Sequence, residues 1–392
     1  MPTSVLAMYE SSSPLADFRY AVHTCKRIDA FRAFEPSWRA LCAAAEAHSP
    51  FIDFAYCEAA AAEALASGAT IEVATVHDAH ELVALWPVAI VRKGVLRSAQ
   101  TLGCGCGEEY GGPLIADTRR TELYDAAREA IRRIHADVLH VPMLENGGAL
   151  QRALDAAPQS WVQTSLPARW RVMPGYAIGL RAYASWNDYL ATRPSTLRSA
   201  LRASGRRLRR EGDVRIGWCE SAEDTERVLT WLFANKRQWA LKRGIDSRYL
   251  MDDRVRDFFI DLARRLDLHS TPLVARIEVD GRPVAASVNL VGARAVEYLI
   301  TTYDEAFGVF SVGNLLVEYI AQWAHAHGRD FDFRPLHGDY KARWADRETR
   351  HESRIIVLNA RGRSIELPLS WTQVKRVYRK AAAVAATRLK SA

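Results

Sequence analysis

The sequence predicts an α/β protein in which mixed sheets are flanked by helices and two similar domains follow one another. Two observations support this fold class: strand-like and helix-like segments alternate along the chain, and the same order of segments occurs twice. The chain has 392 residues, of which 49% are hydrophobic, so it can bury more than one core. We expect a first domain at 20–180, a second at 181–370 and a basic C-terminal helix at 371–392.

The first domain is expected to begin with two helices and to continue with three strands. The helical segments are residues 31–47 and 53–67, and the strand-like segments are residues 70–76, 81–91 and 95–102. A helix at 122–134 and a strand at 137–141 complete this domain.

The second domain repeats this order. Helices are expected at 222–241 and 254–266, strands at 272–279, 284–291 and 295–302, then a helix at 313–327 and a strand at 329–333. Asp280-Gly281 between alternating segments is a hairpin signal. Because the two halves share little identity, the repeat is one of element order only.

The net charge of +7 is concentrated in two segments. Residues 196–210 and 371–392 each contain six basic residues and no acidic one, so the rest of the chain is net acidic. In the first of these segments an arginine recurs at every fourth position and forms one stripe of a helix, which we expect to join the domains. This stripe would face an acidic domain, ligand phosphates or a transfer RNA stem; alternatively, it is a solvated connector paired with the acidic body.

No apolar segment is long enough to cross a bilayer and the N-terminus has no signal-peptide pattern, so we expect a cytoplasmic protein. The helix at 374–389 is expected to contact an anionic membrane only weakly, because its apolar side is mostly alanine. Cys104 and Cys106 have neither zinc-site nor redox spacing. The six cysteines are therefore expected to be mostly buried free thiols, and no metal site is predicted.

The segment from Tyr298 to Trp344 concentrates the reactive side chains. It begins with a predicted strand at 298–303, followed by a glycine-bearing turn at 307–314 that opens an apolar helix. The free N–H groups and the dipole at such a helix N-terminus can hold a phosphate or a pyrophosphate without any cation. Alternatively, the turn simply connects strand and helix, with Ser311 as the N-cap.

The strand after that helix carries Asp332 between two phenylalanines. If Phe331 and Phe333 face the core, Asp332 points to the opposite side of the sheet, where a cleft or a covering helix must lie. Asp332 is therefore a candidate catalytic carboxylate; the alternative is a structural pair with Arg334 on the same face.

The loop beyond this strand adds further candidates. His337 could accept a proton near neutral pH, or it is an ordinary surface histidine. Tyr340 could protonate a leaving group, and Lys341 could do the same or bind phosphates. Trp344 could wall a pocket, although Tyr340 and Trp344 at positions i and i+4 would equally form one apolar helix face.

Three stretches resemble the tandem GNAT-fold acyltransferases, in particular the CelD-like acetyltransferases of polysaccharide biosynthesis, and more distantly the Fem-type peptidoglycan aminoacyltransferases. They are Glu109–Leu114, the basic helix Leu197–Gly212, and the pair formed by Phe307–Leu316 and Phe331–Trp344. The last is the most specific, because Phe331-Asp-Phe333 followed by Gly338-Asp-Tyr-Lys341 resembles the signature of that group closely. The turn Ser311-Val-Gly-Asn314 departs from the usual GNAT glycine pattern, as the turn does in Fem-type proteins.

The resemblance implies transfer of an acetyl or longer acyl group from acyl-CoA, most simply acetyl-CoA, to an amine or hydroxyl, without a metal. A backbone N–H within Thr301–Tyr303 would polarise the thioester carbonyl, and His337 or Asp332 would deprotonate the acceptor. Tyr303 or Tyr340 would protonate the thiolate. The donor would be bound by Phe310, Ser311, Val312, Gly313, Asn314 and Lys341.

The resemblance places a small-molecule or sugar acceptor between the domains, and it implies no oligomeric state. Its contacts would be Glu109, Tyr110, Lys236, Trp239, Arg334 and Trp344. Trp239 would stack on a sugar or belong to the core. The first domain lacks a second Gly-Asp-Tyr-Lys loop, so we expect it to be degenerate. Two alternatives are aminoacyl transfer from transfer RNA and a non-catalytic scaffold of a polysaccharide-assembly complex.

Overall fold

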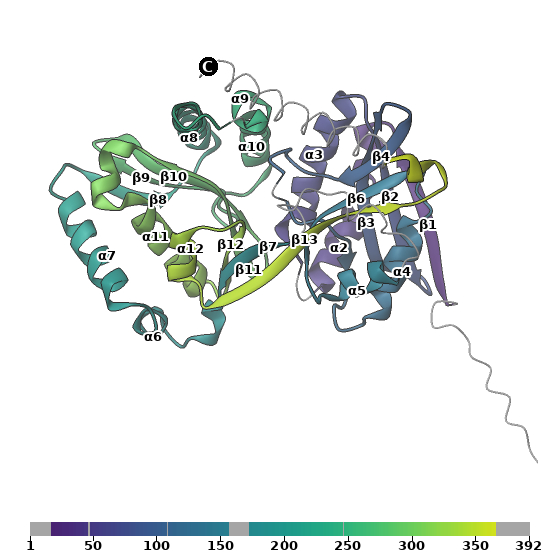
Figure 1. Cartoon of the computed structure of the whole chain (residues 1–392), viewed down its shortest axis with the longest axis horizontal. Helices are drawn as coiled ribbons and strands as arrows, with labels where there is room; N and C mark the ends of the chain where they lie inside the picture. The colour runs from purple at the N-terminus through teal and green to yellow at the C-terminus, as the bar shows by residue number, and fades with distance from the viewer. Residues whose placement is uncertain (1–16, 46–47, 108, 157–171, 246, 366–392) are drawn as a thin grey trace, which may run out of the picture.

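The structure is a computed structural model that describes residues 17–45, 48–107, 109–156, 172–245 and 247–365. Its strands form one continuous mixed sheet flanked by helices, which confirms the predicted α/β class (Figure 1). The basic helix predicted at 371–392 lies outside the described residues.

The first half of the chain contributes six strands and five helices to the described structure. They are β1 (Phe18–Cys25), α1 (Ile28–Arg32), α2 (Glu35–Ala44), α3 (Phe54–Ala66), β2 (Thr70–Asp78), β3 (Glu81–Lys93), β4 (Leu96–Thr101), β5 (Leu114–Ile115), α4 (Glu122–Ile131), β6 (Val138–Glu145) and α5 (Ala149–Asp155).

The second half contains the remaining strands and helices of the described structure. They are β7 (Met173–Ile178), α6 (Trp186–Ala191), α7 (Ser195–Leu208), β8 (Val214–Trp218), α8 (Ala222–Lys242), α9 (Arg248–Met251), α10 (Arg254–Arg265), β9 (Val274–Val279), β10 (Arg282–Val291), β11 (Ala295–Tyr303), the 3-10 helix η5 (Glu305–Phe310), α11 (Val312–Ala326), β12 (Asp330–Pro335), α12 (Asp339–Trp344) and β13 (Arg347–Val357).

The two halves repeat one strand order. β1, β2, β3, β4 and β6 lie side by side in the first half, and β8, β9, β10, β11 and β12 do so in the second. In both sets the first three pairings are antiparallel and the last one is parallel. The parallel step follows a helix in each half, as a crossover connection requires. The predicted repeat of element order is therefore confirmed.

Two strands join the halves into a single sheet. β13, the last strand in the chain, pairs with β6 of the first half, and β7 lies between β13 and β12 (Figure 1). β7 lies before the predicted domain boundary at residue 180 but pairs with strands that follow it. The basic helix, α7, packs against α11 and η5. It is thus part of the second half and does not bridge the two halves.

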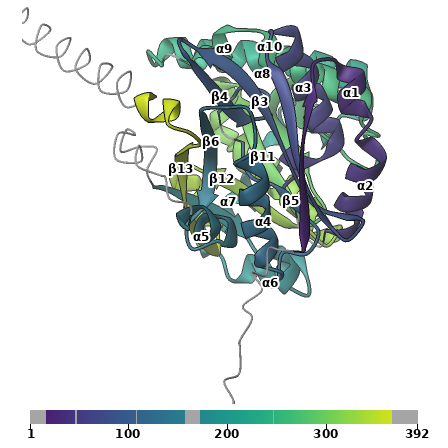
Figure 2. The same ribbon diagram turned by 90° about the vertical axis from the view of Figure 1, so that its right-hand side faces the viewer.

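The helices on one side of the sheet belong to a core shared by both halves. α1, α2 and α3 of the first half and α8 and α10 of the second bury their apolar residues together, and α3 lies beside α10 (Figures 1 and 2). On the other side, α4 covers the first half, and α7 and α11 cover the second. None of the helices in the described ranges combines the length and apolar character that a membrane span requires.

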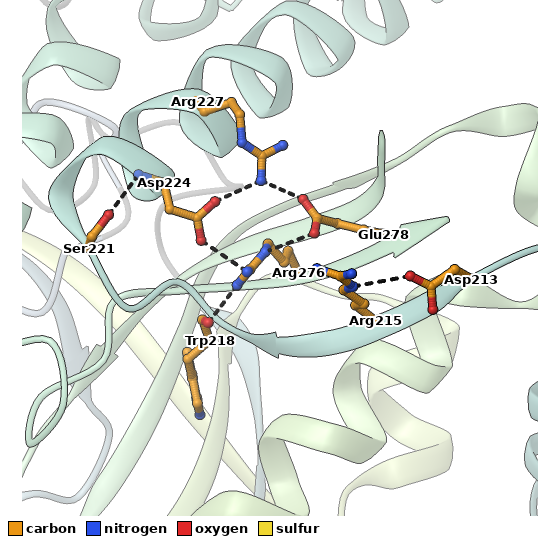
Figure 3. Close-up of polar contacts among 8 residues, drawn as sticks. All are labelled: Asp213, Arg215, Trp218, Ser221, Asp224, Arg227, Arg276 and Glu278. Carbon is orange, nitrogen blue, oxygen red and sulfur yellow. Dashed lines mark hydrogen bonds and ion pairs between the residues drawn. The ribbon is translucent and has the colours of Figure 1, made fainter. Parts of the chain in front are cut away.

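An ion-pair network attaches the N-terminal end of α8 to β9 (Figure 3). Ser221 caps the helix by accepting a hydrogen bond from the Asp224 N–H at 3.1 Å. Arg227 links Asp224 to the buried Glu278, and Arg276 pairs with both carboxylates. Because the buried carboxylate has two arginine partners, α8 has a defined position on the sheet.

Candidate active site

β11 and β12 pair over three residues only and then separate. The parallel ladder joins Ala295–Glu297 to Asp330–Asp332, and Leu299 bulges out of the pairing with β10. The Asp304 N–H donates to the Val284 carbonyl at 2.8 Å, so strand alternation turns the backbone polar groups of Thr301 and Tyr303 away from β10. These groups face the gap between β11 and β12, and bulges of this kind are common beside active sites.

Helix α8 contacts one edge of this gap. Lys236 Nζ donates to the Thr301 carbonyl at 2.7 Å, and Asn235 Nδ2 donates to the Tyr303 carbonyl at 2.9 Å. Lys236 Nζ lies 5.4 Å from the centre of the Trp239 ring, and the Arg243 guanidinium lies 4.8 Å from it. Lys236 therefore holds the edge of the gap, and Trp239 packs against Lys236. The sequence predicts that both bind the acceptor, but neither is among the residues that line the cleft between the halves.

The turn before α11 has an unusual backbone. Ser311 lies in the left-handed region, with φ 51° and ψ 38°, and its side chain makes no capping hydrogen bond. A right-handed residue followed by a left-handed one is the backbone pattern of an anion-binding nest. Ser311 is thus the N-cap residue by position, as the alternative predicts, but its side chain does not cap the helix.

The turn contains a residue whose amide could bind an anion. In the described ranges, the N–H groups of Val312 and Gly313 have no backbone hydrogen-bond acceptor. Val312 is fully buried, whereas Gly313 is partly exposed. The ring of Tyr303 lies over the turn, since a Cβ added at Gly308 or Gly313 would lie 3.5 or 3.6 Å from it. Tyr303 is therefore positioned beside the predicted donor site.

Other predicted donor residues have structural partners. The ring of Phe310 packs beneath the guanidinium of Arg207 at 5.4 Å. Asn314 Oδ1 accepts a hydrogen bond from Trp344 Nε1 at 3.0 Å, and Trp344 is completely buried. Trp344 thus belongs to the core beneath α11 and does not wall a pocket. It shares one apolar helix face with the half-buried Tyr340.

Lys341 does not point toward the turn. Its Nζ donates to the carbonyls of Phe333 at 2.9 Å and of Arg334 and Pro335 at 3.3 Å. It therefore satisfies the end of β12, where Arg334 and Leu336 both have positive φ values of 67° and 89°. Two non-glycine residues in this strained conformation are typical of functional sites.

A cleft of 510 Å³ lies where β12, β7 and β13 meet between the halves. Asp332, Ala177 and Arg347 are register partners across these three strands, so their side chains share one face. Residues from both halves line the cleft, among them Tyr110, Tyr124, Leu150, Asp332, Arg347 and His351. The structure thus brings together Asp332 and Tyr110, which lie 222 positions apart in the chain.

Asp332 accepts two hydrogen bonds in the cleft. The Tyr110 hydroxyl donates to Oδ2 at 2.9 Å, and the Arg334 N–H donates to Oδ1 at 2.6 Å. Burial, together with the Asp332 carboxylate, raises the pKa of Tyr110 well above its usual value. The phenol therefore stays protonated, and it holds the carboxylate in one orientation.

Arg334 supports the floor of this site. Its guanidinium lies between the rings of Phe51 and Tyr110, at 4.4 and 4.2 Å, and its Nη1 pairs with Glu297 at 2.5 Å. Both charged side chains are almost completely buried, and Ser49 donates to the carboxylate of Glu297 at 2.8 Å. Burial raises the pKa of Glu297 against the opposing effect of Arg334. Arg334 is thus a positioning residue beneath Tyr110.

The cleft also contains a histidine that the sequence reasoning missed. The ring of His351 on β13 stacks on Tyr110 at 5.4 Å. Its Nδ1 lies 3.2 Å from the Met143 carbonyl, which only an N–H can approach, so Nε2 accepts the hydrogen bond from Thr349 Oγ1 at 2.8 Å. Burial lowers the pKa of His351, which keeps the imidazole neutral near pH 7. The sequence offers little signal for His351, because polar side chains occupy both faces of β13 around it.

Gly175 makes room for this pair. A Cβ at Gly175 would lie 2.5 Å from Thr349 Oγ1 and 2.7 Å from His351 Nε2. We therefore expect Gly175→Ala to displace both side chains and to destabilise the fold by about 1–3 kcal/mol, measured by urea denaturation. As a control, Gly217→Ala on β8 has open space at its Cβ and should have a much smaller effect. Equal stability of the two variants would contradict the packing described here.

Two predicted residues lie away from the cleft. His337 is 67% exposed and contacts Asp339 and the hydroxyl of Tyr176. Tyr176 alternates with the cleft-lining Ala177 and belongs to the core beneath α11, so His337 lies on the opposite side of the sheet from Asp332. Glu109 is buried against Cys104 and is not among the cleft-lining residues.

The arginines of α7 form a cationic surface beside the turn. In the part of the chain that the structure describes, no acidic side chain pairs with Arg198, Arg202, Arg206, Arg207, Arg209 or Arg210. Three of them, Arg202, Arg206 and Arg209, line a groove of 480 Å³ between α7 and α11. The predicted alternative of a connector paired with the acidic body is thus not what the described residues form.

Residues 195–342 match the family model described as an acetyltransferase (GNAT) domain. The second half has the GNAT fold. Because the first half repeats its strand order, the GNAT fold occurs twice, in tandem. The matched region contains the gap between β11 and β12, the turn before α11 and Asp332, and this fold supports an acyl-transfer enzyme.

Solved structures are similar over both halves of the chain. FemX is 11% identical, with a TM-score of 0.61, over 83% of this chain and 96% of its own. A conserved protein of unknown function from Bacteroides thetaiotaomicron is 12% identical over 83% of this chain and 97% of its own, with a TM-score of 0.49. A tandem GNAT protein from the clavulanic acid biosynthesis pathway is 12% identical over 87% of this chain and 99% of its own, with a TM-score of 0.44. No curated protein matches the sequence.

Proposed function

We propose that this protein transfers an acyl group from acyl-CoA, most simply acetyl-CoA, to an amine or hydroxyl of a small-molecule or sugar acceptor. One observation carries the proposal: β11 and β12 separate directly after Glu297 and Asp332. In this proposal the turn at Ser311, which lies beside Tyr303, is the donor side of the gap, and the cleft with Asp332 is the acceptor side. A thioester in the gap would therefore reach both.

The proposed reaction is a direct attack on the thioester. The N–H of Thr301 or Tyr303 would hold the carbonyl oxygen as it gains negative charge, a contribution that is typically about 3 kcal/mol. Asp332, oriented by Tyr110, would accept the proton of the attacking amine or hydroxyl, and neutral His351 is a second acceptor in the same cleft. Tyr303 or Tyr340, on the donor side of the sheet, would protonate the leaving thiolate.

The residues of the cleft also favour a polar, ring-shaped acceptor such as an amino sugar. Tyr124 offers an aromatic ring, whereas Asp332 and Arg347 offer charged hydrogen-bonding groups. A role in exopolysaccharide or cell-envelope synthesis follows if the acceptor is a sugar of that kind, and the sequence resemblance points the same way.

A second candidate function is aminoacyl transfer from charged transfer RNA. The observation that favours it is the row of α7 arginines beside the donor turn, which have no acidic partner among the described residues. Phosphates are the usual partners of such rows. This function uses the same gap and the same acceptor cleft, but it needs a nucleic acid donor.

Thermal-shift measurements with acetyl-CoA, longer acyl-CoA, free CoA and aminoacyl transfer RNA distinguish these functions. We expect the CoA compounds to raise the melting temperature in the absence of RNA, because a ligand that binds only the folded state stabilises it. Salt-sensitive binding of transfer RNA without any effect of CoA would support the second function and contradict the first. No shift with any donor would favour a non-catalytic scaffold.

A further inference from the structure

The loop that delivers Tyr110 to the cleft contains a second cluster of reactive side chains. The Sγ atoms of Cys104 and Cys106 and a carboxylate oxygen of Glu109 all lie within 4.8 Å of one another. All three side chains are buried, with exposed fractions of 3%, 9% and 7%. Cys104 and Cys106 also belong to the core shared by both halves, but the proposed reaction does not use this convergence of donor atoms. We propose that these three residues bind one zinc ion that fixes the loop.

The backbone of the loop is shaped around the carboxylate. Gly105 and Gly107 have positive φ values of 85° and 79°, which allow the chain to curl and turn both thiols inward. A Cβ at Gly103 would lie only 2.8 Å from Glu109 Oε1. That oxygen also accepts hydrogen bonds from the Gly105 N–H at 3.0 Å and from Cys104 Sγ at 3.2 Å. The glycine spacing is thus explained by the convergence of the donor atoms.

The donor set selects the class of metal. Two sulfur atoms and one carboxylate oxygen suit zinc, whereas calcium and magnesium prefer oxygen ligands only. The hydroxyl of Tyr56 accepts a hydrogen bond from the Cys104 N–H at 3.1 Å, so one further oxygen lies beside this cluster. Cys104 and Cys106 are buried thiols that are not part of a disulfide, as the sequence predicts.

Metal binding here leaves the charge of the interior unchanged. Zinc would replace the proton of each thiol, so two protons leave for every divalent ion that enters. The zinc would fix Glu109. Because Tyr110 is the next residue, the zinc would also keep the Tyr110 hydroxyl in position against Asp332.

The site is tested on the full-length protein purified without chelator. We expect elemental analysis to find about one zinc per chain. Cobalt(II), added after the zinc is removed, should show thiolate charge-transfer absorption and the visible bands of tetrahedral coordination. Cys106→Ser should lose the zinc and the charge-transfer intensity. Cys219→Ser, another buried lone thiol in the second half, should keep both.

Three results would overturn the proposal. The first is wild-type protein that holds no zinc after purification and binds none when it is added. The second is a disulfide between Cys104 and Cys106 in the native protein. The third is zinc that persists in Cys104→Ser but is lost in Cys42→Ser, which would assign it to the half-buried group of Cys42, His48 and Asp53. The wild-type measurements need no variant to fold.

Discussion

Replacement of Arg334 by methionine is expected to lower the free energy of unfolding by about 3–5 kcal/mol. Methionine retains apolar contact with the rings of Phe51 and Tyr110, but it leaves the Glu297 carboxylate buried without its cation. Taking one partner from a buried ion pair costs far more than the pair itself contributes, because the remaining charge has lost both water and counter-charge. Urea denaturation followed by tryptophan fluorescence measures the change.

The second partner and a surface arginine provide the controls. Arg334→Met combined with Glu297→Gln removes both charges. The amide oxygen of the introduced glutamine can still accept the hydrogen bond from the Ser49 hydroxyl, so the double variant should recover most of the lost stability. Arg254→Met breaks only an exposed pair with Asp252 and should change stability little. If Arg334→Met alone proves as stable as the wild type, the buried pair does not support the site in the way described.

Asp332→Asn is expected to lower kcat/KM by a factor of about 10²–10⁴. The amide has the shape of the carboxylate, and its oxygen can still accept a hydrogen bond from the Tyr110 hydroxyl or the Arg334 N–H. However, the asparagine amide cannot take up the proton of the attacking amine or hydroxyl. Release of free CoA from acetyl-CoA, measured with a panel of amino sugars and hydroxyl acceptors, gives the rate.

A matched substitution on the same strand separates chemistry from folding. Asp330 also accepts a backbone hydrogen bond, from the Arg181 N–H at 3.1 Å, but it is not among the cleft-lining residues. Asp330→Asn should retain nearly all activity, and both variants should bind acetyl-CoA as tightly as the wild type. Full activity of Asp332→Asn would exclude Asp332 as the proton acceptor and leave His351 as the base.

Most of the strands and helices could be predicted because their patterns are local. The strand expected at 295–302 is β11 (Ala295–Tyr303), and the helix expected at 313–327 is α11 (Val312–Ala326). Their apolar periodicity arises from one buried face each, and a buried face is visible in a short stretch of sequence. Asp332 could be placed on the face opposite Phe331 and Phe333 for the same reason.

The join between the halves could not be predicted because it depends on pairing across long sequence separations. β13 carries charged residues on both faces, so its pattern does not resemble a buried strand. Only the partners β6 and β7 make it part of the sheet and place His351 beside Tyr110. His337 is also a histidine and lies nearer to Asp332 in the sequence than His351 does. The end of β12 nevertheless turns His337 to the opposite side of the sheet.

The donor turn provides the most direct test of the account, since everything proposed for the reaction requires the diphosphate of the donor near the Gly313 N–H. Gly313→Ala introduces a Cβ at an ordinary contact distance of 3.6 Å from the Tyr303 ring and should keep the fold and the donor site. Gly313→Trp fills the space over the turn. Isothermal titration with acetyl-CoA compares the two variants with the wild type.

We predict that wild type and Gly313→Ala bind acetyl-CoA with similar affinity, and that Gly313→Trp folds but loses binding by at least about tenfold, equivalent to about 1.4 kcal/mol. Unchanged affinity in Gly313→Trp would mean that the donor binds elsewhere, and the proposed function would then have no donor site at this turn.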